Sequence, residues 1–116
     1  MKKAKKVKVK KTFKVYCTTF PDGTYYIGFS TKMGAAYEKY FGSNSEILKM
    51  VKAGNHGLVK ETIAEFEKRS HAKATEAILQ WNNRHDPKMR NQMWNVRLRL
   101  DHLSDLVVPA WEPRKQ

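Results

Sequence analysis

The chain has 116 residues, a length that suits one small domain and is too short for two. Hydrophobic residues make up 41% of it, an ordinary share for a globular protein, which excludes a fully disordered or fibrous chain. No apolar run reaches the roughly 18 residues that a membrane span needs. The single cysteine, Cys17, excludes an internal disulfide and a multi-cysteine zinc site. No apolar segment follows the basic N-terminus, as it would in a signal peptide, so we expect an intracellular protein.

The positive charge is concentrated at the N-terminus. The formal net charge is +12, and residues 1–14 contain eight lysines and no acidic residue. Such a block repels itself, so residues 1–11 are expected to form a disordered tail that binds a polyanion, with a purely solubilising tail as the alternative. Nucleic acid is the favoured polyanion, since the tail lacks the apolar stripe of a membrane-binding helix. The tail residues expected to contact it are Lys2, Lys3, Lys5, Lys6, Lys8, Lys10 and Lys11.

The rest of the chain alternates strand and helix patterns in the order β-β-α-α-β-α-α. The expected strands are 12–20, 24–29 and 58–66, and the expected helices are 33–41, 43–53, 71–83 and 91–106. Gly42 and Gly54 are expected to end the first two helices, and Ser43 and Ser70 to cap the second and third. The buried face of the third helix is expected to contain Ala72, Ala77, Ile78 and Trp81.

This order predicts a small α+β domain, with a three-stranded antiparallel sheet flanked by helices, over residues 12–107. Pro109 and Pro113 then indicate a C-terminal tail over 108–116. Trp81, Trp94 and Trp111 are expected to serve the core of so small a domain, with stacking on bases as the alternative.

The first two strands place Tyr16 ten residues before Tyr26. A three-residue loop at Pro21-Asp22-Gly23 would pair Thr18 with Tyr26 and put Tyr16 diagonal to Tyr26 on the same face. A loop of two or four residues would put the two tyrosines on opposite faces. Taken alone, tyrosines in strands usually serve packing.

Several motifs in order resemble the GIY-YIG nuclease family over about residues 12–95. They are Lys14-Val15-Tyr16, Tyr26-Ile27-Gly28, the aromatic-Gly-Ser stretch Tyr40-Phe41-Gly42-Ser43 of phage-type members, the acidic helix with Ala72 and Glu76, and Asp86-Pro87-Lys88-Met89-Arg90-Asn91. Lys14 and Val15 replace the usual Gly and Ile. The arginine that the family carries in its first helix is replaced by Ala36, flanked by Lys32 and Lys39.

The resemblance implies a metal-dependent endonuclease that hydrolyses phosphodiester bonds in DNA, of phage or homing type. Tyr16 would be the general base, which needs nearby cations because a free tyrosine has a pKa near 10. Glu76 would bind Mg²⁺ or Mn²⁺, and Tyr26 would orient the water or the phosphate. Lys32 or Lys39 would offset negative charge on the phosphate. Asn91 would hold the site by hydrogen bonds, with Asn95 as second choice.

Two other functions remain open. Ala36 favours a protein that kept the fold and DNA binding but lost catalysis. The third possibility is an interaction protein that binds another nuclease or a polymerase. The chain has no room for a separate sequence-reading domain after residue 95, so specificity is expected to come from the catalytic domain and the tail, or from a homodimer or a protein partner. His85 and His102 are expected at the surface, away from any metal.

Overall fold

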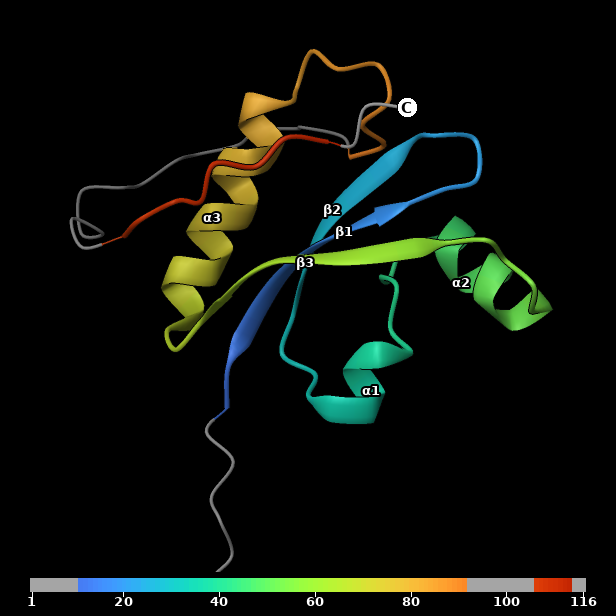
Figure 1. The fold of residues 1–116 in the computed structure, drawn as a ribbon, viewed down its shortest axis with the longest axis horizontal. Coiled ribbons are helices and arrows are strands. Elements are labelled where there is room, and N and C mark those ends of the chain that lie inside the picture. Colours follow the sequence, from blue (N-terminus) through green and yellow to red (C-terminus); the bar gives the residue numbers. More distant parts are fainter. Residues whose placement is uncertain (1–10, 92–105, 114–116) are drawn as a thin grey trace, which may run out of the picture.

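A computed structural model describes residues 11–91 and 106–113, which form a small α+β domain. Its elements are β1 (Phe13–Thr19), β2 (Tyr25–Ser30), α1 (Gly34–Glu38), α2 (Ser45–Ala53), β3 (Val59–Phe66) and α3 (Arg69–Asn82). The strands form one antiparallel sheet in the order β2-β1-β3, so β1 is central (Figure 1). The predicted fold class is therefore confirmed.

The β1–β2 hairpin has the predicted three-residue loop. The Phe20 amide donates to the Thr24 carbonyl at 2.7 Å, and the Gly23 amide donates to the Phe20 carbonyl at 2.9 Å. Gly23 has a φ of 87°, a conformation that glycine adopts without strain. Thr18 lies opposite Tyr26 in the register. Tyr16 and Tyr26 therefore share one face of the sheet, as the turn chemistry predicts.

The two predicted N-caps are wrong. The side chain of Asn44, and not of Ser43, accepts a hydrogen bond from the Glu46 amide at 2.9 Å at the start of α2. Helix α3 begins after Lys68 without a side-chain cap, and Ser70 lies inside its first turn. In both cases a residue with suitable chemistry stands one or two positions from the cap that the backbone selects.

The ends of the first two helices differ in how well the sequence predicts them. Helix α1 has only five residues and its C-cap is Lys39, so it ends before the expected stop at Gly42. Helix α2 ends at Gly54, as predicted, where a φ of 77° suits glycine.

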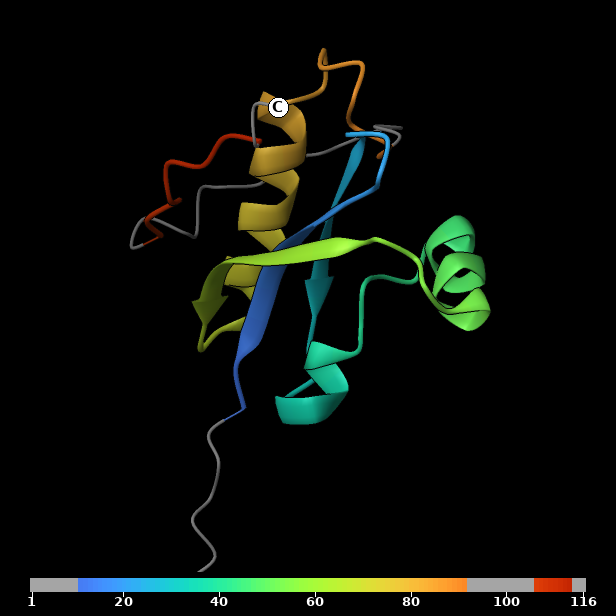
Figure 2. The same cartoon turned by 45° about the vertical axis from the view of Figure 1, so that its right-hand side comes forward.

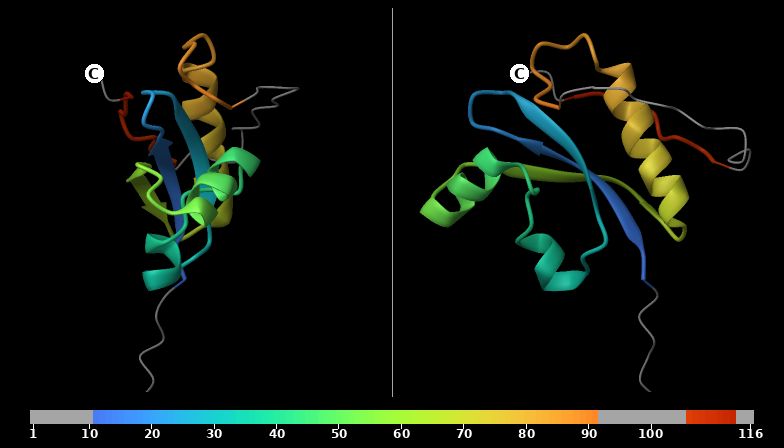
Figure 3. Two further views of the ribbon diagram at one scale, coloured as in Figure 1. Left: turned by 90° about the vertical axis from the view of Figure 1, so that its right-hand side faces the viewer. Right: turned by 180° about the vertical axis from the view of Figure 1, so that it is seen from behind.

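Helix α3 covers one face of the sheet (Figures 1 and 3). Its buried stripe contacts the sheet side chains Val15, Cys17 and Ile27. Of the predicted core positions only Ala72 is fully buried, whereas Ala77 and Ile78 are half-buried and Trp81 is 40% exposed. The stripe instead runs through Ala72, Thr75 and Leu79. Burial follows the helical spacing of three and four residues rather than the largest side chains.

The opposite face carries Tyr16 and Thr18 and is covered by α1 and the loop after it. The Tyr37 ring of α1 meets the Tyr16 ring edge to face at 6.3 Å. The Thr18 hydroxyl donates to the Phe41 carbonyl at 2.5 Å. These contacts bring the loop between α1 and α2 (Figure 2) against the tyrosine face of the hairpin.

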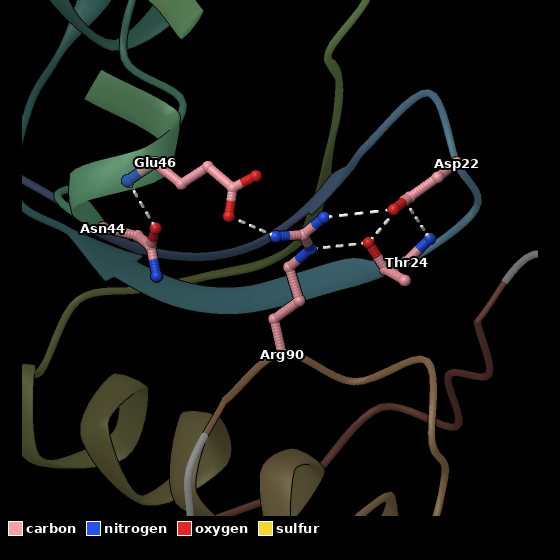
Figure 4. Close-up of polar contacts among 5 residues, drawn as sticks. All are labelled: Asp22, Thr24, Asn44, Glu46 and Arg90. Atoms are coloured by element: carbon pink, nitrogen blue, oxygen red, sulfur yellow. Dashed lines mark hydrogen bonds and ion pairs between the residues drawn. The ribbon is translucent and has the colours of Figure 1, made fainter. Parts of the chain in front are cut away.

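The outer edge of β2 is paired with the segment that follows α3. The Tyr25 amide donates to the Lys88 carbonyl at 2.9 Å, and the Arg90 amide donates to the Tyr25 carbonyl at 2.8 Å. The Arg90 guanidinium donates to Thr24 at 2.5 Å, to Glu46 at 2.6 Å and to Asp22 at 3.2 Å (Figure 4). One guanidinium therefore joins this segment to the hairpin turn and to α2.

Residues 106–113 have no helix or strand, but Val108 and Trp111 pack against the α3-side core. The Trp111 indole donates to Glu61 at 3.3 Å, which supports the expected core role of this tryptophan. The predicted domain boundary at 107 stays a prediction. The helix expected over 91–106, with Trp94, Asn95 and His102, lies almost entirely outside the described ranges, as does the tail before Lys11. None of the helices described is long and apolar enough to cross a membrane.

Candidate functional site

Tyr16 and Tyr26 meet over Gly28, which lies opposite Tyr16 in the hairpin. A Cβ atom on Gly28 would overlap the Tyr16 Oη and would lie 2.9 Å from the Tyr26 Cε1. Gly42 approaches from the loop after α1, and a Cβ there would lie 3.3 Å from the same Oη. Glycine at these two positions is what allows the two tyrosines and the loop to come together.

Tyr40 is the third tyrosine at this point. Its ring meets the Tyr16 ring edge to face at 5.9 Å, and its proximity raises the pKa of Tyr16. Tyr40 belongs to one of the motifs that carry the family resemblance, but the sequence predicted no role for it. Tyr40 lies two residues before Gly42 in the same motif, and this position is the sequence signal that could have identified Tyr40 as a site residue.

The environment of Tyr16 strongly disfavours its phenolate. Burial raises the pKa of Tyr16 far above its ordinary value, and the neighbouring Tyr40, Tyr26 and Glu76 raise it further. Tyr16 is therefore a neutral phenol at physiological pH. To accept a proton from water, Tyr16 must first lose its own, which requires a nearby cation that lowers its pKa.

Glu76 lies on α3, next to Thr75 of the buried stripe. Its side chain is 16% exposed, and burial raises its pKa above the ordinary 4.5, whereas Lys73 at 3.2 Å lowers it. Its charge is felt at both Tyr16 and Tyr26. Ala72, one turn earlier, is fully buried in the core between α3 and the sheet.

The donor set suits a hard cation that keeps most of its own water. No cluster of three or more His, Cys, Asp or Glu side chains occurs in residues 11–91 and 106–113. Glu76 is therefore the carboxylate available beside the tyrosines, and Mg²⁺ commonly binds through one or two carboxylates together with waters and substrate phosphates. The residues present fit such an ion.

The raised pKa of Glu76 predicts how cation binding depends on pH. Because a protonated carboxyl binds divalent cations poorly, Mn²⁺ affinity should fall on acidification with a midpoint above 4.5. Lys73→Met should move this midpoint upward, because Lys73 lowers the pKa. Titration of the full chain with Mn²⁺, followed by electron paramagnetic resonance at several pH values, measures both. A midpoint at or below 4.5 in both proteins would contradict the burial of this carboxylate.

Of the two lysines expected at the site, only Lys32 lies close to a tyrosine ring in the described part of the chain. Lys32 is exposed, with its Nζ 5.2 Å from the centre of the Tyr40 ring. Lys39 is exposed at the end of α1, and no contact of its side chain with the tyrosines is seen in the described part of the chain. Ala36 is exposed on α1. The structure thus favours Lys32 over Lys39 as the cation near the tyrosines.

Lys60 is a site residue that was not predicted from the sequence. Its Nζ lies 3.6 Å from the centre of the Tyr37 ring, donates to the Tyr40 carbonyl at 2.8 Å, and also donates to the Tyr37 carbonyl. Burial lowers the pKa of Lys60. Because Lys60 lies on β3 opposite Thr18, it ties the end of α1 to the sheet and holds Tyr40 beside Tyr16.

We expect Lys60→Met to release Tyr40. The variant keeps the side-chain stem but loses two charged hydrogen bonds, at a cost of about 1.5–3 kcal/mol each at most. Once Tyr40 moves away, the pKa of Tyr16 should fall, which ultraviolet titration of tyrosinate measures. Lys14→Met is the matched control, since the Lys14 Nζ lies 5.1 Å from the centre of the same Tyr37 ring but donates to the Lys32 carbonyl. Identical tyrosine titrations in the two variants would contradict this role.

Asn91 is fully engaged with the backbone of Ile27. The Ile27 amide donates to Asn91 Oδ1 at 2.8 Å, and Asn91 Nδ2 donates to the Ile27 carbonyl at 2.9 Å. Gln80 donates to the same carbonyl at 3.0 Å. Asn91 therefore fixes the residue between Tyr26 and Gly28, and its part in catalysis stays a prediction.

No family model, curated protein or solved structure matches this chain. The resemblance to the GIY-YIG nucleases therefore rests on the motifs in the sequence, and any function must be inferred from the geometry of the site.

Proposed function

We propose that this protein is a metal-dependent endonuclease of the GIY-YIG type that hydrolyses phosphodiester bonds of DNA inside the cell. The observation that carries the proposal is that Tyr16, Tyr26 and Tyr40 lie together on one face of the sheet, and that the Glu76 carboxylate raises the pKa of Tyr16 and Tyr26. These side chains come from β1, β2, the loop after α1, and α3. A largely buried carboxylate among three phenols costs stability, so a packing role alone does not explain it.

Each residue has a role in this proposal. Glu76 holds the divalent cation, which when bound supplies Lewis acidity and favours ionisation of water. Tyr16, once its own hydroxyl proton has been released to solvent, accepts a proton from the attacking water as a phenolate, and a solvent proton goes to the leaving oxygen. Tyr26 orients the water or the phosphate, and Lys32 offsets charge on the phosphate. The water oxygen bonds to phosphorus while the bond to the leaving oxygen breaks.

Because the pKa of Tyr16 is high, Tyr16 can act as a base only when that pKa is lowered. In the free protein the neutral phenol is a poor base, so water is not activated. Burial is the main cause of the raised pKa of Tyr16 and Tyr26, and the Glu76 carboxylate adds to it. A cation at Glu76 would offset the contribution of the carboxylate, so in this proposal the site becomes competent when it holds a cation.

A DNA-binding protein without catalysis is the second candidate. The observation in its favour is Ala36, which is exposed on α1 where the resemblance implies an arginine. A lysine such as Lys32 is a point charge and lacks the two-pronged geometry of arginine toward phosphate.

Nicking of supercoiled plasmid by the full chain separates the two candidates. With Mg²⁺ we expect relaxed and then linear plasmid, and with EDTA we expect none. The variant Glu76→Gln, purified in the same way, controls for contaminating nucleases. Salt-dependent plasmid binding without nicking, in both Mg²⁺ and Mn²⁺, would reject the nuclease and leave the binding protein. Absence of both binding and nicking would favour an interaction protein.

A further inference from the structure

Cations and aromatic rings form a continuous strip beside Glu76. Arg69 and Lys73 of α3 lie over the same Phe29 ring, at 5.6 and 4.9 Å from its centre. Phe29 stacks on Phe13 at 6.1 Å, and the Lys11 Nζ lies 5.9 Å from the centre of the Phe13 ring. We call these five residues the basic strip.

The basic strip connects the candidate site to the N-terminal tail. Lys73 is 3.2 Å from Glu76, and Arg69 is one turn further toward the start of α3. Lys11 lies just before β1, and the start of β1 lies at the same end of the domain as the start of α3 (Figure 1). A ligand that leaves Glu76 along the strip therefore arrives where the lysine-rich tail joins the domain.

The charge of the strip is available to an anion. Within the described ranges, Arg69 forms no ion pair with a carboxylate. The Lys73 side chain is 46% exposed, and its partner Glu76 is the carboxylate to which we assign the divalent cation. The electron-rich face of Phe29 lets two like charges lie close together. A phosphate backbone would remove the remaining repulsion between them.

The spacing of the two α3 cations suits a nucleic-acid strand. Arg69 and Lys73 are four positions apart in α3, which corresponds to about 6 Å along the helix axis. On one strand of B-form DNA the axial rise is about 3.4 Å per nucleotide and the backbone also turns around the axis, so cations this far apart can each contact a phosphate of the same strand. A guanidinium binds phosphate through two parallel donors, and an ammonium binds it as a point charge.

We propose that the basic strip is the path of the DNA backbone on one side of the scissile phosphate. The strand passes Lys73, then Arg69, then Lys11. This inference rests on the proposed function and adds to it a direction for the substrate across the protein.

Two double variants test the path. Arg69→Gln with Lys73→Gln removes two charges from the strip, and Lys49→Gln with Lys52→Gln removes two exposed charges from α2, which lies on the other side of the domain (Figure 1). Binding of a fluorescent DNA duplex is measured in EDTA, where cleavage cannot occur, over a range of KCl concentrations. Thermal unfolding confirms that both variants fold.

The strip variant should bind DNA several-fold more weakly at low salt. The slope of log affinity against log salt should become shallower by about 0.9 for each phosphate that the variant no longer neutralises. The α2 variant should keep the slope of the unmodified protein. Equal slopes in the two variants, or no salt-dependent DNA binding by the unmodified protein, would overturn the path.

Two further outcomes separate the proposals. If the strip variant alone has a shallower slope but the unmodified protein never nicks plasmid, the path stands as a binding surface and the nuclease is rejected. Vesicles containing phosphatidylserine test the alternative polyanion. Loss of vesicle binding by the strip variant, with unchanged DNA binding, would overturn the path in favour of a membrane surface.

Discussion

Replacing Tyr16 with phenylalanine should lower the rate of DNA cleavage by about 10²- to 10⁴-fold, the range that a general base contributes. The substitution removes the hydroxyl group and keeps the buried ring that meets the Tyr37 and Tyr40 rings edge to face. Removal of this hydroxyl should cost about 1 kcal/mol of unfolding free energy or less. Plasmid nicking in Mg²⁺ and urea unfolding measure the two effects separately.

Tyr25→Phe provides the matched control. Tyr25 is on the same hairpin and is also buried, and its hydroxyl donates to Asp86 at 2.8 Å. Its ring lies on the α3 side of the sheet, away from the tyrosine face. The control should therefore lose similar stability but cleave within a few-fold of the unmodified protein. Cleavage within a few-fold by Tyr16→Phe as well would assign Tyr16 to packing alone.

The tyrosine hairpin could be predicted because its determinants are local. Pro21-Asp22-Gly23 selects the loop length, and the loop length selects the register. The register then decides that Tyr16 and Tyr26 share a face and that Gly28 lies beneath them. Nothing distant in the chain enters this inference.

The polar side chains that hold the site in place by hydrogen bonds could not be predicted in this way. Lys60 holds Tyr40 from a strand twenty residues later, and Asn91 holds Ile27 from a segment 64 residues later. Each of these side chains makes hydrogen bonds to backbone atoms, which have no signature in the sequence. Arg90 is equally hard to predict, because its partners lie in the hairpin turn and in α2, far from it in the chain (Figure 4).

The prediction of the buried stripe of α3 failed for a different reason. Hydrophobicity favoured Ile78 and Trp81, but the helix turns Ala72, Thr75 and Leu79 to the sheet. The Arg84 guanidinium covers the Trp81 ring at 4.0 Å, which stabilises the tryptophan at the surface. This rotation also places Glu76 at the edge of the stripe, where its charge reaches the tyrosines.

Glu76→Gln should abolish metal-dependent cleavage without loss of stability. Because burial raises the pKa of Glu76, the ionised carboxylate is less favourable in the folded protein than in the unfolded chain. Its contribution to stability therefore decreases as pH rises from the unfolded pKa through the folded pKa. A neutral amide of the same size should leave the free energy of unfolding at neutral pH equal or higher, which urea titration measures.

Cleavage in Mg²⁺ should fall by several orders of magnitude in this variant, because an amide is a weak ligand for a hard divalent cation. Excess Mn²⁺ should restore part of the rate, and DNA binding in EDTA should be equal or slightly tighter, since one repulsive carboxylate is removed. Glu65→Gln is the matched control, because Glu65 is exposed on β3 and its carboxylate accepts a hydrogen bond from Thr12 at 3.0 Å. It should cleave as the unmodified protein does. Unchanged cleavage by Glu76→Gln would instead move the metal assignment to Glu65 or Glu61.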